Sequence, residues 1–131
     1  MMVWNKEPMP ERRLRLARDP GSAGEARRFI ERLLRKRQVP ERARDSALLV
    51  SSELVSNAYQ HGEGEIELRV SMFEDRLRIE VIDEGTDQAP AVREQPADET
   101  GGWGLRIVDQ LALQWGVFEG TTHVWADLAL A

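Results

Sequence analysis

The segment Glu53-Leu-Val-Ser-Asn57-Ala-Tyr-Gln-His61-Gly62 is the most informative feature of this chain. It places a carboxylate, a carboxamide and an imidazole at positions i, i+4 and i+8 of a predicted helix. Four helical residues turn about 40° beyond one full turn, so these three side chains form one polar stripe along the helix. Apolar residues flank the stripe and form the buried face of the helix: Val50, Leu54, Val55, Ala58 and Tyr59.

A polar stripe at the edge of a buried face is costly unless it meets a partner. From the stripe alone two interpretations stay open: a ligand site, or a half-exposed boundary row that binds nothing. Gly62 follows the last predicted turn, and we expect it to end the helix as an ordinary C-terminal cap.

The composition indicates one globular domain. The chain has 131 residues, of which 41% are hydrophobic and 31% charged. No stretch approaches the roughly 20 apolar residues of a membrane span, and the first residues lack the apolar core of a signal peptide. The absence of cysteine excludes disulfides and thiolate metal sites and fits a reducing compartment. We therefore expect a cytoplasmic protein without a membrane partner.

Charge is unevenly distributed along the chain. Residues 1–44 hold 13 Lys and Arg against 6 Asp and Glu, whereas residues 45–131 hold 5 against 17. A basic half could contact nucleic acid or an acidic protein. Its basic residues, however, alternate with Phe29, Ile30, Leu33 and Leu34, the pattern of an amphipathic helix without an aromatic stacking platform. A solvated helix face is favoured, so we expect no direct nucleic-acid partner. The apolar residues would offer a homodimer a pairing surface.

Hydrophobic periodicity predicts the order of elements. We expect a loose tail at 1–12 and a single domain at 13–131, with helices at 23–37 and 45–61 and a third opening at Leu105. Strands are expected at 13–17, 66–72, 77–83, 115–119 and 122–130. This order predicts an α+β two-layer sandwich, in which a mixed β-sheet carries its helices on one face.

Two features downstream of the helix could serve a ligand. Asp83 has the phase of Leu77, Ile79 and Val81, so its carboxylate points toward the apolar layer where the strand ends, and it could accept a hydrogen bond from an exocyclic amine. A strand-end turn cap is the alternative. Gly101-Gly-Trp-Gly104 opens a helix, and such a turn offers backbone N–H groups to a phosphate. Between them, residues 86–100 lack any period, as functional or mobile loops do.

The polar stripe supplies the chemistry that would complete such a site. The Asn57 amide oxygen is a hard ligand that suits Mg²⁺ when phosphates and water complete the coordination. Glu53, one turn earlier, could act as a base on a hydroxyl or a water. Each part alone is a weak signal, and together they are much stronger.

Taken in this order, the chain resembles the GHKL ATP-binding superfamily, or Bergerat fold. Within it the chain looks most like the histidine-kinase-like ATPases of the anti-sigma-factor serine/threonine kinase type. The N box of that family resembles Glu53 to Gly62, and its G1 box resembles Asp83-Glu-Gly85. Its G2 box resembles Gly102-Trp-Gly104-Leu105, and a late Gly-Thr resembles Gly120-Thr121.

The resemblance implies a role for each matching residue. Asn57 would ligate a Mg²⁺ that bridges the ATP phosphates, and Glu53 would be the catalytic base. Asp83 would bind the adenine amino group, with Gly85 allowing close approach. Residues 86–100 would form a lid over ATP. The remaining implied contacts to the nucleotide are His61, Gly102, Gly104, Leu105 and Thr121.

The resemblance also implies partners: a sigma factor, an antagonist protein with a serine or threonine to phosphorylate, or both. One departure concerns Asp87, where the family often has a second glycine. It keeps an alternative open, namely an ATP-responsive module that sequesters a protein partner with little or no phosphoryl transfer. A sensor histidine kinase fragment fits less well, because no residue before 45 is a histidine.

Overall fold

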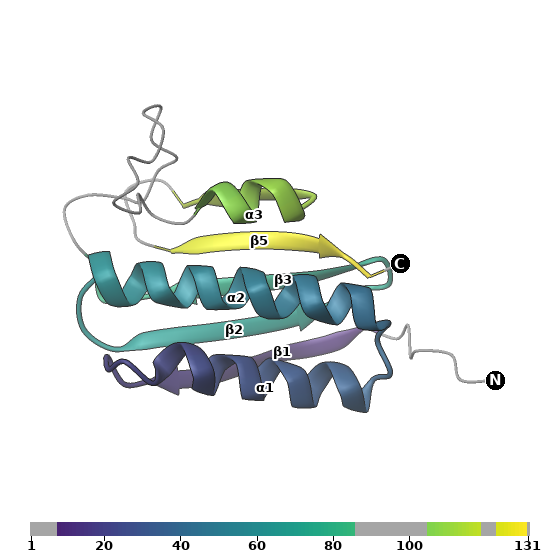
Figure 1. Ribbon diagram of the computed structural model, residues 1–131, viewed down its shortest axis with the longest axis horizontal. Coiled ribbons are helices and arrows are strands. Elements are labelled where there is room, and N and C mark those ends of the chain that lie inside the picture. Colours follow the sequence, from purple (N-terminus) through teal and green to yellow (C-terminus); the bar gives the residue numbers. More distant parts are fainter. Residues whose placement is uncertain (1–7, 86–104, 119–122, 131) are drawn as a thin grey trace.

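The structure is a computed structural model that describes residues 8–85, 105–118 and 123–130. It has one layer of helices on one β-sheet (Figure 1). The elements in chain order are β1 (Met9–Leu16), α1 (Ser22–Lys36), α2 (Glu41–His61), β2 (Ile66–Met72), β3 (Arg76–Ile82), α3 (Leu105–Leu111), β4 (Gln114–Val117) and β5 (Val124–Ala129).

The described strands form one sheet in the order β1-β2-β3-β5-β4, and all four neighbouring pairs are antiparallel. The α+β two-layer fold is therefore confirmed, but the expectation of a mixed sheet is wrong for these strands. The reason is the even number of helices between β1 and β2. Because α1 runs back along the sheet and α2 returns, β2 starts beside the end of β1 and must run antiparallel to it.

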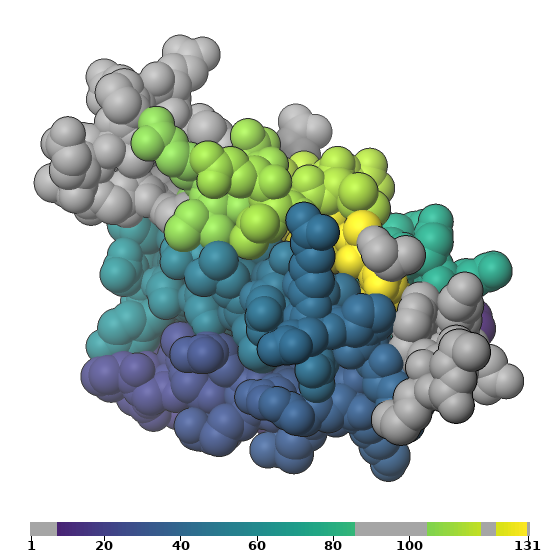
Figure 2. Space-filling view, turned by 45° about the vertical axis from the view of Figure 1, so that its right-hand side comes forward, coloured from purple at the N-terminus to yellow at the C-terminus, as the bar shows by residue number. Residues whose placement is uncertain are grey.

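The core lies between the sheet and the helices. The predicted alternation is confirmed in β2 and β3, where Ile66, Leu68, Val70, Met72, Leu77, Ile79 and Val81 are all buried. The helix α2 is central in its layer: it packs against α1 on one side and α3 on the other, as Figure 2 also shows. Its face toward the sheet buries Val50, Leu54, Val55 and Ala58.

Two elements begin four residues earlier than expected. The strand β1 begins at Met9, inside the segment 1–12 that was assigned to a tail, because Met9 is buried beside Met72 beyond an irregularity in the register. The helix α2 begins at Glu41, directly after Pro40, rather than at Asp45. Its first turn is polar and exposed apart from Ala43 and Arg44, which are half-buried, so it shows no apolar period that a sequence pattern could reveal.

Candidate functional site at the end of the central helix

The site is built around the last two turns of α2. Asn57 lies on this helix and is only 5% exposed. Its side-chain nitrogen Nδ2 is buried and has no hydrogen-bond partner among the residues that the structure describes. Buried amide groups are normally paired, because leaving one unpaired costs free energy. The Asn57 nitrogen is therefore a buried donor for which the described residues supply no acceptor.

The end of α2 touches the end of β3 through Gly62 and Asp83. A Cβ atom placed on Gly62 would overlap the carboxylate oxygen Oδ2 of Asp83 and the backbone oxygen of Ala58. Only glycine therefore allows the Asp83 carboxylate to lie this close to the helix end. The contact joins two segments that are about 20 residues apart in the sequence, and it confirms that Asp83 faces the helix layer.

Gly62 was expected to be a C-terminal cap, and its backbone requires a different explanation. Its N–H does bond to the Ala58 carbonyl at 3.0 Å. Its φ of −95° and ψ of −167°, however, are extended and open to any residue, not the left-handed conformation of a glycine cap. The glycine is required here by the space that Asp83 occupies.

Beyond Asp83 the chain turns tightly. The Gly85 N–H donates to Asp83 Oδ1 at 2.7 Å, and Gly85 has a φ of +97°, where glycine is strongly preferred. The Glu84 N–H donates to the Glu63 carbonyl at 2.8 Å, and a Glu84 side-chain oxygen accepts from the Glu65 N–H. The loop after α2 and the loop after β3 are thus joined by two hydrogen bonds, both of which Glu84 makes.

Glu53 lies one helical turn before Asn57 and is half-buried. Burial raises the pKa of its carboxyl above the ordinary value, because the charged form loses hydration. A carboxylate with a raised pKa is a stronger proton acceptor than a fully hydrated one, which is the property that a general base requires.

The other predicted contacts fall into two groups. His61 is the last residue of α2 and is half-buried, so it lies at the same end as Asp83. Leu105 is the first residue of α3, and its buried side chain belongs to the hydrophobic core. Gly102, Gly104 and Thr121, together with the predicted lid at 86–100, lie outside the described residues.

Sequence reasoning missed Arg18, which follows β1. Its guanidinium donates to the carbonyls of Ala58 and Tyr59 in the last turn of α2 at 2.7 and 2.6 Å, and to the Gly64 carbonyl at 2.9 Å. These hydrogen bonds join residues that are 40 or more positions apart in the sequence, so no local sequence pattern predicts them.

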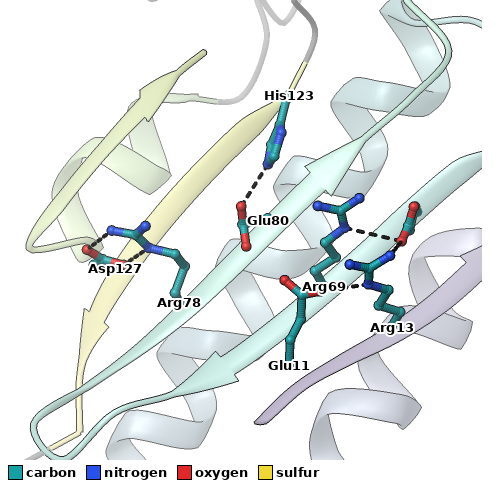
Figure 3. Close-up of polar contacts among 8 residues, drawn as sticks. Glu11, Arg13, Arg69, Arg78, Glu80, His123 and Asp127 are labelled. Carbon is teal, nitrogen blue, oxygen red and sulfur yellow. Dashed lines mark hydrogen bonds and ion pairs between the residues drawn. The ribbon is translucent and has the colours of Figure 1, made fainter.

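A second buried polar group lies on the opposite face of the sheet (Figure 3). Asp127 on β5 is 0% exposed, and it accepts hydrogen bonds from Arg78 at 2.7 and 2.9 Å and from Gln114 at 2.8 Å. Burial raises the pKa of Asp127, but the hydrogen bonds and the positive charges of Arg78 and Arg76 outweigh burial, so the pKa is lowered. This carboxylate is fully partnered within the protein itself.

None of the helices within the described ranges combines the length and apolar character needed to cross a membrane. A family model described as a histidine kinase-like ATPase domain matches residues 16–126. No curated protein matches the chain.

Among solved structures, the chain is similar to the crystal structure of the RsbU and RsbW domains of Rv1364c from Mycobacterium tuberculosis. The TM-score is 0.68 at 20% sequence identity, and the match covers 92% of this chain. It covers 31% of that chain, so the present chain spans about a third of its length. At this identity the match shows a shared fold, which confirms the fold expected from the sequence.

Proposed function

The chain belongs to the histidine kinase-like ATPase domain family, and on that premise we propose that it binds ATP with Mg²⁺ at the junction of α2 and β3. We further propose that it is an anti-sigma factor that phosphorylates a serine or threonine of an antagonist protein. The observation that carries the proposal is the junction itself. The last turns of α2 carry there a buried Asn57 whose side-chain nitrogen has no partner among the described residues, and the carboxylate of Asp83 lies against Gly62 at the end of the same helix.

The residues present fit a magnesium nucleotide. Asn57 offers a buried carboxamide whose oxygen is a hard ligand that would suit Mg²⁺, and its nitrogen, which has no partner in the described part of the chain, could donate to a phosphate oxygen. Asp83 donates no proton when ionised, so it can only accept, as recognition of the adenine amino group requires. No three His, Asp or Glu side chains within the described ranges gather into a metal site, so phosphate and water would supply the other ligands of a cation at Asn57.

Phosphoryl transfer assigns a role to Glu53. The hydroxyl oxygen of the partner's serine or threonine forms a bond to the γ-phosphorus, and the bond from that phosphorus to the β–γ bridging oxygen breaks. ADP leaves, and the hydroxyl proton passes to the Glu53 carboxylate. A bound Mg²⁺ would neutralise negative charge on the phosphates. The raised pKa of Glu53 favours its taking the proton at this stage.

The partner classes come from the sequence resemblance: a sigma factor, an antagonist protein, or both. That Rv1364c carries a domain called RsbW adds support from the fold. A role beside a transcription factor would place the protein in the cytoplasm, as the sequence composition also favours. Nothing in this assignment requires contact with nucleic acid.

The proposal is tested with ATP labelled at the γ-phosphate, Mg²⁺, and candidate antagonist domains encoded in the same genome. We expect label on a serine or threonine of one such domain. Glu53→Gln should bind Mg-ATP normally and transfer phosphate about 10²–10⁴-fold more slowly, the usual contribution of a general base. Glu41→Gln is the matched control, because Glu41 is exposed in the first turn of the same helix.

Two results would contradict the proposal in different ways. If the wild type binds a partner in the presence of ATP but never labels it, the protein is an ATP-responsive binding module and not a kinase. If Glu53→Gln transfers phosphate as fast as the wild type, the kinase assignment stands and Glu53 is not the base.

A further inference from the structure

The loop that follows β1 reaches across the sheet end to the candidate site. Arg18 lies two residues beyond Leu16, the last residue of β1, which pairs with Ile66 at the start of β2. It is half-buried, and its guanidinium donates hydrogen bonds to three backbone carbonyls: those of Ala58 and Tyr59 on α2 and of Gly64 in the loop that follows.

The chemistry of this contact suits the end of a helix. The last four carbonyls of an α-helix have no partner within the helix, and they form the negative end of its dipole. A guanidinium offers five donors in a rigid plane and carries a permanent positive charge, so it can bond several such carbonyls at once. A lysine would keep the charge but has only one nitrogen to reach the three oxygens.

The carbonyls that Arg18 holds belong to the segment that forms the site. Ala58 directly follows Asn57, and Gly64 comes two residues after Gly62, whose backbone lies against Asp83. The same segment is also bonded to the loop after β3, where the Glu84 N–H donates to the Glu63 carbonyl. Residues 58–64 are therefore held both by Arg18 and by the loop after β3.

We propose that Arg18 is a positioning residue of the nucleotide site, which holds the end of α2 so that Asn57 and Asp83 keep the spacing that Mg-ATP requires. This inference rests on the proposed function. The hydrogen bonds of Arg18 described above go to backbone carbonyls, so it would act through Asn57 and Gly62. Replacing a group that orients a ligand-binding residue typically costs about 10–100-fold in affinity or activity.

The experiment compares the wild type with Arg18→Gln and, as a matched control, Arg12→Gln, which removes the same charge from an exposed position on β1. Hydrogen exchange is measured without nucleotide, and Mg-ATP affinity by titration calorimetry. We expect Arg18→Gln to lose protection at the amides of Gly62 and Glu84, and to bind Mg-ATP about tenfold more weakly. The amide of Phe73, which bonds to Arg76 in the hairpin between β2 and β3, is the reference and should keep its protection.

Each other outcome overturns the inference in a distinct way. Equal loss of protection at Phe73 would make Arg18 a general stabiliser of the fold. A selective loss of exchange protection at Gly62 and Glu84 with unchanged Mg-ATP affinity would show that Arg18 holds the end of α2 but does not affect ligand binding. If the wild type does not bind Mg-ATP, the proposed function fails and the positioning role fails with it.

Should Arg18→Gln not fold, Arg18→Lys gives the same readouts. It keeps the charge near the helix end but cannot bond the three carbonyls together, so a smaller weakening of Mg-ATP binding in the same direction is expected. Affinity equal to that of the wild type would then show that charge alone suffices and would overturn the geometric role.

Discussion

Two buried polar side chains, Asp127 and Asn57, lie on opposite sides of the sheet, and they differ in their hydrogen-bond partners. Asp127, on the face away from the helices, is held by Arg78 and Gln114, and its pKa is lowered. On the helix side, the Asn57 side-chain nitrogen has no partner among the described residues, and burial raises the pKa of nearby Glu53. Asp127 has hydrogen-bond partners for its carboxylate within the protein, whereas the Asn57 nitrogen lacks an acceptor among the residues that the structure describes.

Asp127 has the features of a residue that stabilises the fold, whereas Asn57 and Glu53 have the features of residues in a functional site. A partnered carboxylate such as Asp127 stabilises the fold, and removing it leaves Arg78 without its acceptor. An unpaired carboxamide and a poorly hydrated carboxylate cost stability in the free protein, and such costs are typical of binding and catalytic sites. A phosphate oxygen of the proposed nucleotide could accept the hydrogen bond for which Asn57 has no acceptor among the described residues.

The largest effect on stability is expected from Asp127→Asn. The change removes a negative charge that two hydrogen bonds from Arg78 require, so unfolding in urea should show a loss of about 2–3 kcal/mol. Mg-ATP affinity should be unchanged, because Asp127 lies on the other face of the sheet. A loss below about 0.5 kcal/mol, within the range of ordinary surface substitutions, would contradict this view of Asp127.

The stability difference between the wild type and Asp127→Asn should also depend on pH. The folded-state pKa of Asp127 is lowered below its unfolded value, so its stabilisation is present above the unfolded pKa and disappears as the pH falls through the folded pKa. The difference in stability between the wild type and Asp127→Asn should therefore shrink in acid. A difference that stays constant down to low pH would show that charge is not the cause.

A smaller effect is expected from Asp83→Asn on the helix side. An asparagine presents a donor as well as an acceptor toward the adenine amino group, so the preference for ATP over GTP should fall about tenfold, which corresponds to one charged hydrogen bond. The control is Asp75→Asn, whose side chain is 80% exposed in the turn between β2 and β3. An unchanged preference, measured by calorimetry with both nucleotides, would leave Asp83 as a strand cap only.

The smallest effect is a gain in stability from Glu53→Gln. Because burial raises the folded pKa of Glu53 above its unfolded value, the penalty is absent in acid and grows as the pH rises through the folded pKa. The variant should therefore be slightly more stable than the wild type at neutral pH and equal to it in acid. A variant that is less stable at neutral pH would show that Glu53 stabilises the fold.

Most of the fold could be predicted because its signals are local. Period-two alternation gave the buried faces of β2 and β3, and the same phase placed Asp83 toward the helix layer. The resemblance of Glu53 to Gly62 placed the site on one helix. The start of α2 could not be predicted, because its first turn is polar and exposed apart from two half-buried residues.

What sequence could not predict depends on contacts between distant segments. Gly62 has the local pattern of a helix cap, and only the position of Asp83 reveals why a side chain cannot fit. Arg18 is one of several arginines in a basic segment, and nothing local distinguishes it from Arg12 or Arg15. Its proposed positioning role depends on hydrogen bonds to the end of α2, which is 40 residues away.

We infer that Asn57 is buried for a ligand and not for the fold. Asn57→Ala, with Ser56→Ala as the neighbouring control, should be tested by calorimetry with Mg-ATP and by urea unfolding. We predict Mg-ATP affinity lowered by about 10–100-fold and stability equal to or above that of the wild type, because the substitution removes an unpaired buried amide. Equal affinity for Mg-ATP, or weaker binding that only accompanies a large loss of stability, would contradict the account.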